Sequence, residues 1–116
     1  MGASTLVFNE LVSRIAEKAA AQTRNARLEP IREWGNGRTD GYLVESSLER
    51  VVVIAREQDM LTLADISAVR RAMTRAQARR ALLYIPLTAT VPNPVMLLAT
   101  LSKVEIVRLT ATESIV

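Results

Sequence analysis

The chain has 116 residues, of which 49% are hydrophobic, and a formal net charge of +3 at pH 7. It contains neither cysteine nor histidine, which excludes disulfides, zinc sites with Cys or His ligands, cysteine nucleophiles and Ser-His-Asp relays. Any metal ion bound here would therefore be a hard cation on carboxylate and carbonyl oxygens.

The length predicts one domain over residues 1–116, with a tail, about residues 110–116, that is expected to be frayed. No apolar run approaches the roughly 20 residues of a membrane span, and the first residues lack the pattern of a secretory signal. Together with the missing cysteines, these features favour a cytoplasmic protein that does not enter a membrane.

The amino-terminal third predicts a helix followed by an edge strand. Apolar residues recur at helical spacing between positions 8 and 19. Residues 27–34 then predict a strand, and Pro30 places it at a sheet edge because proline cannot donate to a strand ladder. The sequence Gly35-Asn36-Gly37 predicts the turn that follows, and Gly41 is likewise expected to serve turn geometry.

Two further strands are expected over residues 39–44 and 48–56. The centre of the second, residues 51–55, is apolar throughout, which predicts burial of both sheet faces under helices above and below. Because short turns separate the three early strands, these strands can form an antiparallel meander.

The second half of the chain predicts two helical crossovers. Thr62 and Asp65 form a capping-box pattern that starts a helix, and the helix is expected to continue to about Arg80. The elements that follow are a strand over 81–87, a short helix over 95–101 and a strand over 103–109. Because helical crossovers join parallel strands, this order predicts an α/β fold with three layers, α/β/α, and a mixed sheet of about five strands.

A glycine-flanked acid and an apolar strand carry a family resemblance. The run Gly35-Asn36-Gly37-Arg38-Thr39-Asp40-Gly41 precedes the strand Val51-Val52-Val53-Ile54-Ala55-Arg56, and a helix and a strand follow. This order resembles the PD-(D/E)XK nuclease superfamily, in particular the Mrr-type restriction endonuclease domain, from about Phe8 to Leu109. The resemblance implies a restriction-endonuclease-like fold and phosphodiester hydrolysis with Mg²⁺, in which two acids bind the cation and a lysine readies water.

The positions that match this family motif depart from it. Asp40 stands at the first acid position, but Ile54 stands at the second and Arg56 at the lysine position. Asn9 stands at the acid position of the first helix, with Glu10 beside it. Isoleucine cannot bind a cation, and arginine stays protonated, so it stabilises a phosphate but does not act as a base. The resemblance thus implies a degenerate active site with no resident cofactor, in which Arg56 pairs with Asp40.

A rearranged catalytic site is the alternative. A bulge in the third strand could turn Glu57 inward, and Glu10 could join Asp40 as a second metal ligand. Glu45 and Glu49 flank the nearby turn. On this alternative the chain is an active Mg²⁺-dependent DNA endonuclease.

The arginines suggest contacts with nucleic acid. From Ile66 to Val104 the chain carries six cations and no acid, whereas the rest has nine cations and twelve acids. Arg71, Arg75 and Arg79 recur one helical turn apart and are the predicted phosphate contacts. Since no aromatic residue accompanies them, base stacking is not predicted.

The favoured function is a non-catalytic, degenerate restriction-endonuclease-like domain that serves as a nucleic-acid-binding or protein-assembly module. The partner would be DNA, another protein or a second copy of the chain. Besides the active endonuclease, a structural homo-oligomer without a role in nucleic acid is a third hypothesis, because the chain is rich in aliphatic residues.

Overall fold

The computed structural model describes residues 13–18, 21, 26–32, 39–47 and 49–109. Its centre is a five-stranded mixed sheet in the order β1-β2-β3-β4-β5. Neighbouring strands are antiparallel from β1 to β3 and parallel from β3 to β5. The strands are β1 (Arg27–Ile31), β2 (Gly41–Glu45), β3 (Arg50–Ala55), β4 (Arg80–Pro86) and β5 (Val104–Leu109). The predicted meander, the crossovers and the edge position of Pro30 are therefore confirmed.

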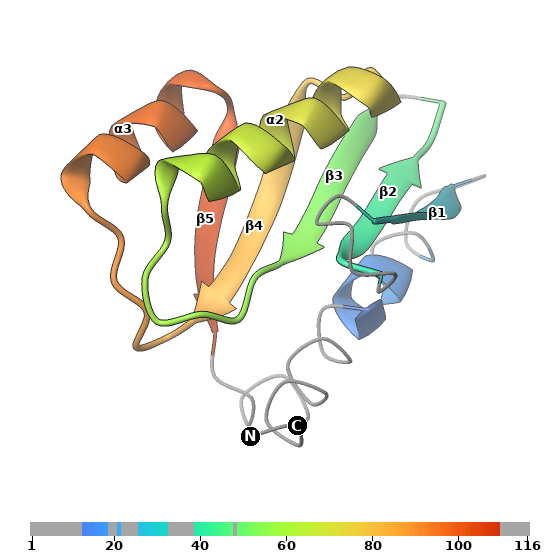
Figure 1. The fold of residues 1–116 in the computed structure, drawn as a ribbon. Helices are drawn as coiled ribbons and strands as arrows, with labels where there is room; N and C mark the ends of the chain where they lie inside the picture. Colours follow the sequence, from blue (N-terminus) through green and yellow to red (C-terminus); the bar gives the residue numbers. More distant parts are fainter. Residues whose placement is uncertain (1–12, 19–20, 22–25, 33–38, 48, 110–116) are drawn as a thin grey trace.

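Helices cover both faces of the sheet. The helices α2 (Leu63–Ala76) and α3 (Asn93–Leu101) lie together on one face (Figure 1). Helical residues 13–18 lie on the opposite face, where Ala16 is fully buried against β2, β3 and β4. This arrangement is the predicted three-layer α/β/α order. None of the helices in the described part of the chain is long and apolar enough to cross a membrane.

Strand β3 contributes to two cores, as its unbroken apolar run predicts. Because side chains alternate along a strand, Val52 and Ile54 join the core beneath α2 and α3. Val51, Val53 and Ala55 join the core on the other face. All five side chains are buried.

Helix α2 begins as predicted and ends earlier than predicted. Thr62 is its N-cap, and Thr62 and Asp65 form the complete capping box. The helix ends at Ala76, because Gln77 takes the left-handed conformation, with φ 56°, and its backbone N–H bonds to the carbonyls of Met73 and Thr74. The expected continuation to Arg80 is wrong: Arg79 lies in the turn before β4.

Several predicted features lie outside the described residues. They include the glycine turn at residues 35–37, the start of the first helix with Asn9 and Glu10, and the tail at 110–116.

Candidate functional site

Asp40 lies where three strands meet. Its backbone N–H donates to the Ile31 carbonyl over 2.7 Å, and its own carbonyl accepts from the Ala55 N–H over 2.9 Å. The residue predicted from the sequence as the first acid is thus fixed by backbone bonds to the ends of β1 and β3.

Gly41, next to Asp40, permits a close approach of two backbones. Gly41 pairs with Ile54 across β2 and β3. A Cβ atom at this position would lie 2.0 Å from the Val53 carbonyl oxygen and 2.6 Å from the Ile54 Cα. This glycine therefore serves the packing of β2 on β3, and the turn geometry expected from the sequence is not what requires it.

Ile54, at the second acid position, is 0% exposed and packs in the aliphatic core beneath α2. A methyl-terminated side chain in this core offers no oxygen to a cation. The position instead adds to the hydrophobic packing that fixes α2 on the sheet.

Arg56, at the lysine position, forms an ion pair with α2. Its Nε lies 2.9 Å from Oδ1 of Asp65, a residue that is only 3% exposed. The other Asp65 oxygen accepts from the Thr62 N–H over 2.8 Å, the Thr62 hydroxyl over 2.9 Å and the Gln58 amide. The guanidinium therefore holds the loop between β3 and α2 to the helix N-terminus, while the expected Arg56–Asp40 pair stays a prediction.

Asp65 is the member of this site that sequence reasoning missed. The capping-box pattern identified it as a helix cap only, and its partner Arg56 lies nine residues earlier. A signal was available, since a short loop keeps the N-terminus of a helix near the end of the strand before it, and an acid is favoured in the first helical turn.

The acids considered for a rearranged site do not gather in the described part of the chain. Glu45 pairs with Arg50 at 2.7 Å, and Glu49 pairs with Arg80 at 3.2 Å. Glu57 is half-buried just after β3. No group of three or more acidic side chains able to hold a metal ion occurs among the described residues.

Helix α2 presents a basic outer surface. Ser67, Arg70, Arg71, Thr74 and Arg75 line a shallow hollow on it and are here called the arginine face. Arg70, which is not among the phosphate contacts predicted from the sequence, belongs to this surface. Arg71 and Arg75 also make other interactions inside the chain.

Arg79 does not belong to the arginine face, so the prediction that Arg71, Arg75 and Arg79 line up along one helix is wrong. Because α2 ends at Ala76, Arg79 lies beyond the helix and lines a separate hollow with Arg80 and Glu49. A contact between Arg79 and nucleic acid remains a prediction.

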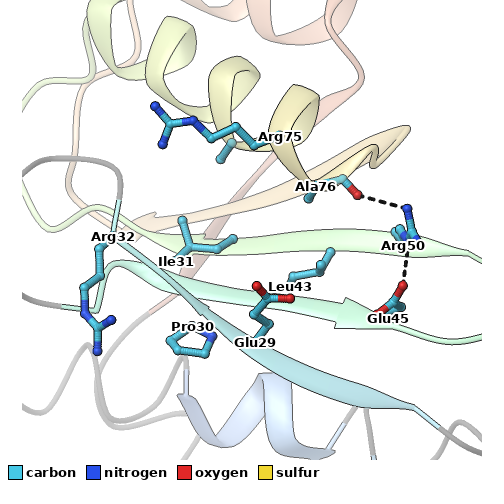
Figure 2. A pocket seen from close by; sticks show the side chains of 10 residues that line it. Glu29, Pro30, Ile31, Arg32, Leu43, Glu45, Arg50, Arg75 and Ala76 are labelled. Carbon is cyan, nitrogen blue, oxygen red and sulfur yellow. Dashed lines mark hydrogen bonds and ion pairs between the residues drawn. The ribbon is translucent and has the colours of Figure 1, made fainter.

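A pocket of about 350 Å³ lies between α2 and the strands β1 and β2 (Figure 2). Aliphatic and charged side chains line it: Glu29, Pro30, Ile31, Arg32, Leu43, Glu45, Arg50, Ala72, Arg75 and Ala76. Arg50 closes one end. Its Nε donates to Glu45 over 2.7 Å, and its Nη1 donates to the Gln77 side chain over 2.8 Å and to the Ala76 carbonyl over 3.5 Å.

Comparison with known proteins reveals a likeness of fold. No family model matches the chain, and no curated protein sequence matches it. The chain is similar to SfsA of Pyrococcus furiosus in complex with Ca²⁺, with a TM-score of 0.52 and 18% identity. That likeness covers 88% of this chain and spans 55% of the SfsA chain. The chain is also similar to the MspJI restriction endonuclease in complex with a 27-mer oligonucleotide, with a TM-score of 0.48, 16% identity and coverage of 90% and 25%.

The likeness to SfsA extends to the fold alone. It agrees with the predicted α/β architecture of restriction-endonuclease-like type, built on a mixed sheet of five strands.

Proposed function

We propose that this chain is a restriction-endonuclease-like domain without catalytic activity, which binds nucleic acid through the arginine face of α2. The observation that carries the proposal is the packing of Ile54, near the end of β3, and the ion pair of Arg56, just after it. Ile54 is 0% exposed in an aliphatic core, and Arg56 is bound to the buried carboxylate of Asp65.

These two positions oppose metal-dependent hydrolysis by the family mechanism. That mechanism needs a second carboxylate beside Asp40 to bind the cation and a base to ready the water. Isoleucine supplies no oxygen, and a guanidinium that donates to a carboxylate keeps its proton.

The arginine face supports binding of phosphates. Arg70, Arg71 and Arg75 are exposed on one helix surface, and each guanidinium offers several donors in a planar fork that suits phosphate oxygens. The Ser67 and Thr74 side chains, which line the same hollow, can add neutral donors to the phosphate backbone.

Fluorescence anisotropy tests the proposal by measuring the binding of short duplex and single-stranded DNA over a series of salt concentrations. Affinity should fall as salt rises. The logarithm of the association constant plotted against the logarithm of the salt concentration should have a slope of about −3 for three contacts on duplex DNA. Changing Arg70, Arg71 and Arg75 to Gln should remove most of this slope. A matched control changes Lys18, Arg27 and Lys103 to Gln, which removes the same charge elsewhere and should retain most of the slope.

Absence of binding at low salt to either form of DNA would contradict a nucleic-acid role. A cleavage assay with Mg²⁺ or Mn²⁺ tests the non-catalytic part. We expect the DNA to stay intact. We also expect the metal ion to leave the melting temperature of the protein unchanged, because an ion that binds only the folded form must stabilise that form. Cleavage that disappears in Asp40→Ala would overturn this part and favour the rearranged nuclease.

Homo-oligomer formation is a second candidate, and the surface of α3 favours it. Leu97 and Leu101 lie one helical turn apart and are 61% and 72% exposed, and the neighbouring Met96 is 42% exposed. Apolar side chains grouped on one helix surface are typical of association sites.

A further inference from the structure

The pocket of Figure 2 adjoins the arginine face, and one residue belongs to both. Arg75 lines the pocket between α2 and β1 and also the hollow on the outer surface of α2. A nucleic-acid strand held by its phosphates on the arginine face would therefore pass the mouth of this pocket. We propose that the pocket receives an unpaired base with an exocyclic amino group, cytosine or adenine, from such a strand. This inference rests on the proposed nucleic-acid function.

The walls of the pocket suit the flat faces of a base. Ile31 and Leu43 project from β1 and β2 toward α2 (Figure 2). The small side chains of Ala72 and Ala76, which also line the pocket, leave room beneath the helix. The volume, about 350 Å³, falls in the range typical of small-ligand pockets, about 300–1,000 Å³. Aliphatic side chains here provide the apolar contact that stacking aromatics provide at other sites.

Glu29 gives the pocket its chemical preference. Glu29 and Ile31 stand on the same side of β1, and Figure 2 shows the Glu29 carboxylate turned toward the space under α2. Glu45, the other acid of the pocket, accepts from Arg50 at 2.7 Å, whereas the described residues give the Glu29 carboxylate no such donor. A carboxylate only accepts hydrogen bonds, so it favours the amino group of cytosine or adenine over the carbonyl of uracil or thymine.

Oligodeoxycytidine and oligodeoxyuridine of equal length test this preference, because their bases differ in the amino and carbonyl groups. Fluorescence anisotropy at low salt should give about tenfold tighter binding of the cytidine strand, the effect of one hydrogen bond to a charged acceptor. Glu29→Gln should bring the ratio close to one, because an amide can both donate and accept. Glu105→Gln, which neutralises an exposed acid on the opposite edge strand, should leave the ratio unchanged.

The outcomes separate this inference from the proposed function. Salt-sensitive binding of both strands with equal affinity, or binding of duplex DNA only, would overturn the base pocket and leave nucleic-acid binding in place. Loss of all DNA binding would overturn both. If the mononucleotide dCMP competes as well as the strand at equal nucleotide concentration, the pocket takes a free nucleotide and the assignment to a strand fails.

Discussion

At the scale of single residues, Gly41 carries the most direct structural requirement near the candidate site. Gly41→Ala places a methyl group 2.0 Å from the Val53 carbonyl oxygen, so β2 and β3 must separate locally. Overpacking of this kind costs typically about 1–3 kcal/mol. We expect the free energy of unfolding, measured by urea denaturation, to fall by about 3 kcal/mol because the clash involves backbone atoms on a central strand.

Ser47→Ala, at an exposed position after β2, serves as the control and should change stability by less than about 0.5 kcal/mol. An unchanged denaturation midpoint for Gly41→Ala would contradict the close approach of the two strands.

The residue scale also shows where sequence reasoning reaches its limit. The capping role of Asp65 was predictable because its partner Thr62 lies three residues away and the pattern is local. The ion pair of Asp65 with Arg56 joins a strand end to a helix start, so it depends on how α2 packs on the sheet. For the same reason Gly41 was interpreted as a turn residue, although its requirement comes from β3.

At the scale of elements, the pairing of β4 and β5 predicts that the folded chain loses stability at alkaline pH. Burial raises the pKa of the Tyr84 hydroxyl above its ordinary value of 10.0, and the negative charge of Glu105 raises it further. The folded chain therefore holds the phenolic proton more tightly than the unfolded chain does. This contribution to stability is present below about pH 10 and is lost as pH rises through the raised pKa.

Urea denaturation at about pH 8 and about pH 11 measures this effect. We expect the unfolding free energy of the wild type to be lower at the higher pH than at the lower pH. This decrease should be smaller in Tyr84→Phe. Tyr42→Phe removes the other tyrosine and leaves Tyr84 in place, so it should show the wild-type fall. An equal fall in the wild type and in Tyr84→Phe would rule out Tyr84 as the cause.

The elements themselves were largely predictable, because apolar periodicity distinguishes the buried β3 from the amphipathic α2. The end of α2 was not. Its helical pattern continues through Arg79, and neither glycine nor proline marks the stop at Gln77. The stop follows from topology, since the chain must turn back to pair β4 in parallel with β3. That turn separates Arg79 from Arg71 and Arg75 and changes which arginines can act together.

At the scale of the whole molecule, layer order and charge asymmetry were visible in the sequence, whereas concave surfaces were not. The pocket arises because α2 covers β3 and β4 more fully than the edge strand β1, and Ala72 and Ala76 are small where they face that edge. Its lining residues come from four elements, β1, β2, β3 and α2. No local pattern relates Glu29 to Arg75, so the sequence predicts phosphate contacts but no site for a base.

The outer surface of α3 allows a prediction about assembly. Leu97 and Leu101 are 61% and 72% exposed. A symmetric dimer would bury four such leucines. Because each is already partly buried in the monomer, together they contribute about 4–8 kcal/mol. Association itself costs about 4–15 kcal/mol. A dimer held by α3 alone should therefore be weak and dependent on concentration.

Light scattering coupled to size exclusion measures this directly, because the monomer has a mass of 12.8 kDa. We expect the average mass to rise toward twice this value as the protein concentration increases. The pair Leu97→Lys and Leu101→Lys should keep the mass at 12.8 kDa throughout. Met60→Lys with Leu87→Lys replaces two other exposed apolar residues, each 54% exposed and outside α3, and should behave as the wild type does. A wild-type mass that stays monomeric at every concentration would eliminate the homo-oligomer and leave nucleic acid as the partner under test.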